Sequence, residues 1–136
     1  MAFDSGLFSF RDVDLWSSEK RSEKKRTNIF TLITNPSFTH RPQHLIRHRI
    51  KHSTHIRFLV FSKYKIKSAQ VFLNDRKLGE AEQSSSSYNK NLFTIKWTPK
   101  ELDSKEWHLV KIIVKGDSSN NYFIYKKILL FLLMLI

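Results

Sequence analysis

Residues 53–62 read Ser-Thr-His-Ile-Arg-Phe-Leu-Val-Phe-Ser, and this stretch gives the clearest indication of the fold. Ile56, Phe58 and Val60 recur at every second position, the spacing at which side chains share one face of a β-strand. The residues between them are also mainly apolar, which is typical of a central strand of a sheet. The stretch therefore predicts the middle of a small β domain.

Proline and turn signals divide the rest of the chain into short segments. Pro36 and Pro99 hold the preceding residue extended and cannot donate a hydrogen bond to a sheet, so each is expected at a strand end or corner. Asn74-Asp75 is a turn signal that precedes a return strand. The apolar stretches between these signals predict about seven strands in an all-β antiparallel sandwich over residues 29–128.

The same alternation predicts the individual strands and the core. A short helix from about Pro42 to Lys51 would interrupt the strand pattern once. We expect strands in 29–33, 54–61, 68–74, 92–97, 108–115 and 122–128, with a return strand that begins at Leu78-Gly79 and a polar loop at 84–87. We expect buried side chains at Ile56, Phe58, Val60, Val71, Leu73, Ile95, Trp97, Leu109 and Ile113.

The composition limits the chemistry and suggests a class of partner. The chain has 136 residues and no cysteine, so it fits one domain and has neither disulfides nor thiol chemistry. Its net charge of +12 favours an acidic protein, anionic lipid or nucleic acid as partner. The charge is distributed evenly along the chain. Residues 1–62 carry 11 basic and 5 acidic residues, and residues 63–136 carry 13 basic and 7 acidic residues. Aromatic residues are sparse in the basic segment from Lys20 to Arg57, so we do not favour nucleic acid.

The two ends of the sequence differ in character. The first ten residues lack the long apolar run of a secretory signal. Residues 1–16 alternate weakly, which predicts a short strand, and residues 17–28 form a charged linker. At the other end, the nine residues 128–136 are all apolar.

The apolar run at the C-terminus has two interpretations. A bilayer span takes about 20 residues, so this run cannot cross a membrane alone. We favour residues 129–136 as a truncated span, because Tyr122, Tyr125, Lys126 and Lys127 suit a headgroup interface. The alternative is that the run extends the closing strand.

Four histidines form the one pattern that resembles a metal site. His40, His44, His48 and His52 are spaced four apart, and two histidines on successive turns of a helix can share a metal ion. Pro42 interrupts the series, and neighbouring arginines would repel a cation. A solvated basic loop explains the series better than a metal site, and we predict no metal ligand.

The remaining candidate residues favour structural roles. Trp97 and Trp107 are expected in the core or at a corner, and Asp12 and Asp14 at exposed strand ends. The sequence has no Asp-x-His, Gly-Asn-His-Asp, Gly-x-Ser-x-Gly or P-loop segment. We therefore predict no catalytic residue, no cofactor-binding residue and no cofactor.

Several segments in order carry a family resemblance. Ile33-Thr34-Asn35-Pro36, Ser53 to Ser62, Val71-Phe72-Leu73-Asn74 and Lys96-Trp97-Thr98-Pro99 resemble the immunoglobulin-like domain of the transmembrane protein 62 family. Phe8 to Leu15 is similar to the strand that ends the phosphoesterase domain of that family. The resemblance extends over most of residues 7–125.

The resemblance implies an immunoglobulin-like sandwich within a membrane protein. The family carries a calcineurin-like metallophosphoesterase domain before this module and several membrane spans after it. None of its metal ligands matches a residue of this chain, so we expect a fragment that is not an enzyme. The implied role is that of a structural or interaction domain, membrane-associated in an endomembrane. A basic protein that binds nucleic acid or anionic lipid is the alternative.

Overall fold

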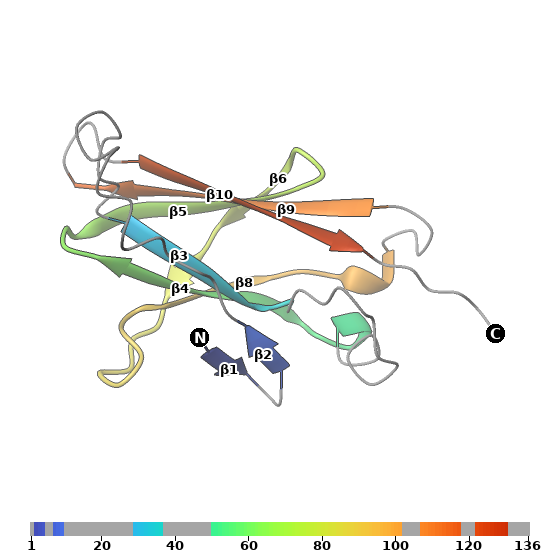
Figure 1. The fold of residues 1–136 in the computed structure, drawn as a ribbon, viewed down its shortest axis with the longest axis horizontal. Helices are drawn as coiled ribbons and strands as arrows, with labels where there is room; N and C mark the ends of the chain where they lie inside the picture. Colours follow the sequence, from blue (N-terminus) through green and yellow to red (C-terminus); the bar gives the residue numbers. More distant parts are fainter. Residues whose placement is uncertain are drawn as a thin grey trace, which may run out of the picture.

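The computed structural model describes residues 2–4, 7–9, 29–36, 50–101, 107–117 and 122–130. These residues form two four-stranded sheets packed face to face, with a two-stranded hairpin beside them (Figure 1). The elements are β1 (Ala2–Asp4), β2 (Leu7–Ser9), β3 (Ile29–Asn35), β4 (His55–Ser62), β5 (Ile66–Leu73), β6 (Arg76–Glu80), β7 (Glu82–Gln83), β8 (Leu92–Lys96), the short 3-10 helix η2 (Pro99–Glu101), β9 (Trp107–Gly116) and β10 (Tyr122–Leu130).

The strand order is that of an immunoglobulin-like sandwich. One sheet, the β3 sheet, has the order β3-β4-β8-β7, and the other, the β9 sheet, has the order β10-β9-β5-β6. All of these neighbours pair antiparallel. In the letters used for immunoglobulin domains the two orders are A-B-E-D and G-F-C-C′. The predicted all-β sandwich is therefore confirmed.

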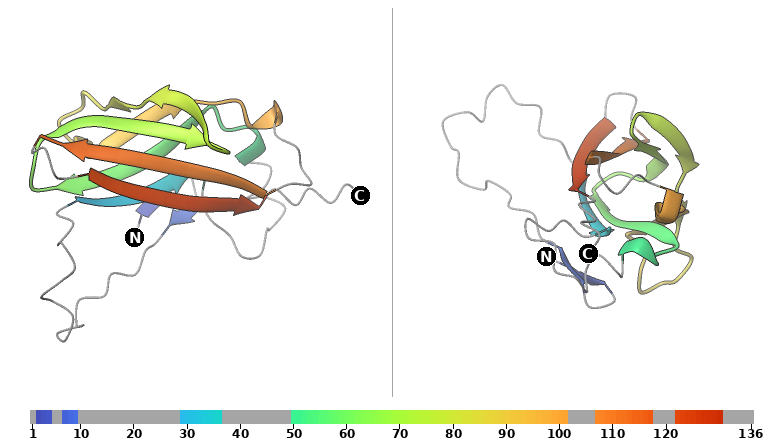
Figure 2. Two further views of the ribbon diagram at one scale, coloured as in Figure 1. Left: turned by 90° about the horizontal axis from the view of Figure 1, so that it is seen from above. Right: turned by 90° about the vertical axis from the view of Figure 1, so that its right-hand side faces the viewer.

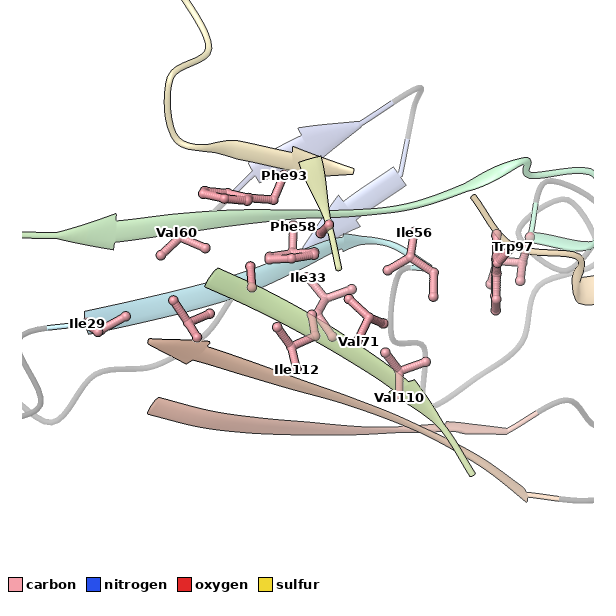
Figure 3. Packing of buried hydrophobic residues seen from close by; sticks show 14 residues of the cluster. Ile29, Ile33, Ile56, Phe58, Val60, Val71, Phe93, Trp97, Val110 and Ile112 are labelled. Atoms are coloured by element: carbon pink, nitrogen blue, oxygen red, sulfur yellow. The ribbon is translucent and has the colours of Figure 1, made fainter. Parts of the chain in front are cut away.

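The core lies between the two sheets (Figure 3). Phe58 of β4 stacks on Phe93 of β8, with ring centroids 5.7 Å apart and ring planes 15° apart. Each large apolar side chain buried in this way is worth about 1.5–3 kcal/mol. Of the predicted core, Leu73 and Ile95 are only half-buried against this cluster. The predictions confirmed as buried are Ile56, Phe58, Val60, Val71 and Trp97.

The predicted core face of β9 is wrong. Leu109 and Ile113 are half-buried, whereas the opposite face of the strand is buried. Lys111 and Lys115 share the face of these two residues, and burying their amines would cost more than burying two aliphatic side chains gains. The buried residues of β9 are His108, Val110, Ile112, Val114 and Gly116.

The turn between β5 and β6 confirms the predicted Asn74-Asp75 signal. Asn74 has a φ of 49° and Asp75 a φ of 63°, the left-handed conformation that both central residues of a type I′ turn require. The Asn74 side chain accepts from the Leu109 N–H at 2.9 Å through Oδ1, so its Nδ2 faces His108 Nδ1 at 2.8 Å. An amide nitrogen can only donate, so the buried His108 accepts at Nδ1.

The hairpin of β1 and β2 lies outside the sandwich, next to β3 (Figure 2). A single short strand was predicted in this part of the chain. On the outer face of the β3 sheet, Leu32, Leu59 and Leu92 stand in direct register across three strands. Leu32 is nevertheless only 2% exposed, although its neighbours Thr31 and Ile33 point to the core face. The β3 sheet is thus apolar on part of both faces.

The chain enters and leaves the sandwich at opposite ends. Ile29, the first residue of β3, pairs with Ser62, the last residue of β4. Leu130, the last residue of β10, pairs with Trp107, the first residue of β9. The first residues of the apolar run, from Ile128 to Leu130, therefore lie in the closing strand. In the parts of the chain that the structure describes, no helix is long and apolar enough to cross a membrane.

Candidate functional site

One end of the sandwich, at which β4, β7 and β9 all end, gathers positive charge. The loops that meet there are 63–65, 84–91 and the start of the loop after β9 at Asp117, and they lie at the left of Figure 1. We call this the lysine-rich end. Antiparallel pairing brings the loops together, because alternate strands of each sheet run in the same direction. Its exposed basic residues are Lys63, Lys65, Lys67, Lys90 and Lys115.

A pocket with a volume of about 150 Å³ lies at this end. Its floor is apolar, because Val60 and Phe93 are core residues exposed by only 2% and 4%. Its walls are polar, and Lys65 and Lys90 come from two different loops. The full lining is Val60, Ser62, Tyr64, Lys65, Ile66, Gln83, Lys90, Asn91 and Phe93.

Hydrogen bonds fix the two loops that carry these lysines. Tyr64 N–H donates to the Ser62 hydroxyl oxygen at 3.0 Å, and Asp117 N–H donates to the Lys65 carbonyl at 3.0 Å. In the other loop, Gln83 Nε2 donates to the Lys90 carbonyl at 2.6 Å. The backbone of both pocket lysines is therefore held in place without a ligand.

The pocket is positively charged. None of the nine lining residues is acidic. Glu82 precedes Gln83 in β7 but does not line the pocket. Among the described residues, no carboxylate lies within salt-bridge distance of Lys65 or Lys90. Two lysines and no carboxylate therefore line this pocket, so its charge favours an anion.

The opposite end of the sandwich uses its polar groups internally. Trp97, buried beside the end of β8, donates from Nε1 to the Ser53 hydroxyl at 2.9 Å. At the β5–β6 turn, Lys111 Nζ lies 2.8 Å from Asp75 Oδ1 and 4.9 Å from the centre of the Phe72 ring. At this end the polar groups of these side chains bond within the protein, so few of them remain available to a ligand.

The structure places only part of the predicted candidates. His52 is exposed, and His40, His44 and His48 lie outside the described residues, as do Asp12, Asp14 and most of the helix predicted from Pro42 to Lys51. Trp97 is a core residue, as predicted, and nothing is described of the Trp107 side chain. Over the described ranges, no group of three His, Asp or Glu residues could hold a metal ion.

Sequence reasoning missed the pocket. Lys65 and Lys90 are 25 positions apart, and neither stands in a motif. The strand order supplies the missing information, because it puts the β4–β5 and β7–β8 loops at the same end of the two sheets. An assignment of strands to the A-B-E-D and G-F-C-C′ sheets would have predicted this neighbourhood from the sequence.

The strand order, the core and a β9 strand at the centre of its sheet define an immunoglobulin-like domain. Residues 23–130 match the family described as the TMEM62 Ig-like domain, and the chain belongs to this family. It is 32% identical over 124 residues to a mouse protein named Transmembrane protein 62. That match covers 88% of the chain and 17% of the mouse protein, so the chain spans about a sixth of its relative. No solved structure matches the chain.

Proposed function

We propose that this chain is a non-catalytic accessory domain of a membrane protein, with a structural or interaction role. The direction of the chain carries the proposal: β3 begins at the lysine-rich end and β10 finishes at the opposite end. A domain built in this way holds the segments attached to its two ends apart, as a spacer does. Membrane association is supported by the name of the mouse relative, of which the chain matches a sixth.

The absence of phosphoesterase activity belongs to the same proposal. Two-metal hydrolysis needs carboxylates and histidines that clamp both ions. The sequence contains no Asp-x-His or Gly-Asn-His-Asp segment that would supply them. The domain would contribute shape and contacts to a larger protein, while any hydrolysis would be performed elsewhere in that protein.

Two measurements test these two parts. The purified chain is incubated with a generic phosphodiester and Mn²⁺, and we expect no turnover above the buffer rate. Turnover that a chelator abolishes would contradict the proposal. For membrane association, flotation with liposomes compares the full chain with one that ends at Leu130, which keeps β10 intact. The full chain should float to a greater extent, and equal flotation would show that residues 131–136 are not an anchor.

A further inference from the structure

We propose that the pocket at the lysine-rich end binds the phosphate group of a small phosphate monoester. The inference concerns a ligand of the domain and does not depend on the accessory role proposed above. Lys65 and Lys90 would hold the phosphate oxygens, and the apolar floor would contact the organic part of the molecule.

The charges in the pocket determine whether its ligand is an anion or a cation. Two lysines line it and no acidic residue does, so its electrostatic field favours an anion. A phosphate monoester carries close to two negative charges at neutral pH, which matches two ammonium groups. A carboxylate carries one, so it would leave one ammonium group uncompensated. Outside the pocket, the same end carries the exposed lysines Lys63, Lys67 and Lys115 against the exposed acidic residues Glu82 and Asp117, so its charge stays positive.

The hydrogen-bonding groups in the pocket add donors for phosphate oxygens. The Ser62 oxygen already accepts from the Tyr64 N–H, so its own O–H remains able to donate. Lysine ammonium groups donate up to three hydrogen bonds each and accept none. Charge-assisted hydrogen bonds of this kind are about twice as strong as neutral ones. Lys65, Lys90 and Ser62 thus offer hydrogen-bond donors to an anion in the pocket.

The size and floor of the pocket indicate an organic ester. The pocket has a volume of about 150 Å³, which is that of several water molecules at about 30 Å³ each in the liquid. This volume is larger than one phosphate group fills. Val60, Ile66 and Phe93 line the pocket and cannot bond to phosphate oxygens. The remaining space therefore suits a short carbon-containing stem. Because hydrogen bonds hold both loops, binding requires little ordering of the protein backbone.

Titration followed by ¹⁵N–¹H correlation spectra tests the site. We expect glycerol 3-phosphate to shift the amide signals of Ser62, Tyr64, Lys90 and Asn91 in a saturable manner. Lys65→Met and Lys90→Met should each weaken binding about tenfold, and the double variant should abolish it. Lys77→Met is the matched control, because Lys77 is an exposed lysine of β6 that does not line the pocket. It changes the net charge equally and should alter affinity less than about twofold.

Two further arms identify the source of the phosphate. Inorganic phosphate should bind more weakly than the ester, because it cannot reach the apolar floor; equal affinity would contradict the role of that floor. Vesicles containing phosphatidate, compared with phosphatidylcholine alone, show whether a lipid headgroup uses the same two lysines. The absence of saturable shifts with every probe would overturn the site. An equal loss of affinity in the Lys77 and Lys65 variants would do so too, since binding would then depend on net charge alone.

Discussion

The two ends of the sandwich differ in what their polar side chains contact. At the end with the β5–β6 turn, Trp97 bonds to Ser53, and Asn74 bonds to His108, so polar side chains hold the structure together. At the lysine-rich end, hydrogen bonds to the backbone carbonyls of Lys65 and Lys90 hold the loops, and the same two residues line an open pocket. The comparison suggests that stability resides mainly at one end and binding at the other, and substitutions at four places test that division.

The largest effect is expected at Trp97. Trp97→Ala removes a buried side chain and leaves a cavity, so it should lower the free energy of unfolding by about 3–5 kcal/mol. Trp97→Phe keeps most of the buried area but loses the hydrogen bond to Ser53, so its cost should be clearly smaller. Urea unfolding followed by fluorescence and circular dichroism measures both. A cost below about 1 kcal/mol for the alanine variant would show that this end does not secure the fold.

Asn74 should have a medium effect. Asn74→Ala loses the bonds to His108 and Leu109 and puts alanine at a positive φ, which together should cost about 1–3 kcal/mol. Asn74→Gly tolerates the backbone conformation and loses only the amide, so the difference between the two variants isolates the backbone term. Thermal and urea unfolding should both show that wild type is more stable than Asn74→Gly, and that Asn74→Gly is more stable than Asn74→Ala. Equal stability of wild type and the glycine variant would mean that the amide network contributes nothing.

The ion pair at the same end should contribute little. The Asp75 side chain is 76% exposed and that of Lys111 21% exposed, so water screens their attraction. Asp75→Asn should therefore change the free energy of unfolding by no more than about 0.5 kcal/mol. High salt should reduce even that difference. A loss of several kcal/mol would place this pair among the structural contacts, next to Trp97 and Asn74.

The smallest effect on stability is expected at the lysine-rich end. Replacing Lys63, Lys65 and Lys90 together by serine removes three exposed like charges that make no ion pair within the described part of the chain. Stability should stay within about 0.5 kcal/mol of wild type or rise slightly at low salt, because repulsion is relieved. Unfolding curves at low and high salt provide the measurement. Marked destabilisation would mean that these lysines support the fold, and the contrast between the ends would disappear.

The sequence predicted the sandwich better than its surfaces. Alternation located β4 and β5, and the Asn74-Asp75 signal located a turn, because these features depend on neighbours in the chain. The core face of β9 was assigned wrongly, although Lys111 on the chosen face was a local signal against it. Both faces of β9 carry aliphatic residues, so alternation alone cannot decide between them.

The pocket was beyond local reasoning for a different physical reason. Lys65 and Lys90 come to the same pocket because β4 pairs with β8, which puts the loop after β4 beside the loop before β8. No periodicity along the chain encodes that meeting. The hydrogen bond between Trp97 and Ser53 at the opposite end was missed for the same reason, since these residues are 44 positions apart.

The chain enters the sandwich at one end and leaves it at the other, so the length of the strands sets the distance between these two points. β9 has ten residues, and a strand rises about 3.3 Å per residue, so the sandwich is roughly 30 Å long. In any family member whose chain passes from the last strand straight into a bilayer, with the strands perpendicular to it, the pocket would stand about that far above the lipid surface. The field of anionic headgroups decays over about 8–10 Å at physiological salt, so little of it would extend to Lys65 and Lys90. In such a protein a dissolved phosphate ester would reach the proposed site without attraction by the headgroups of the membrane that carries the domain.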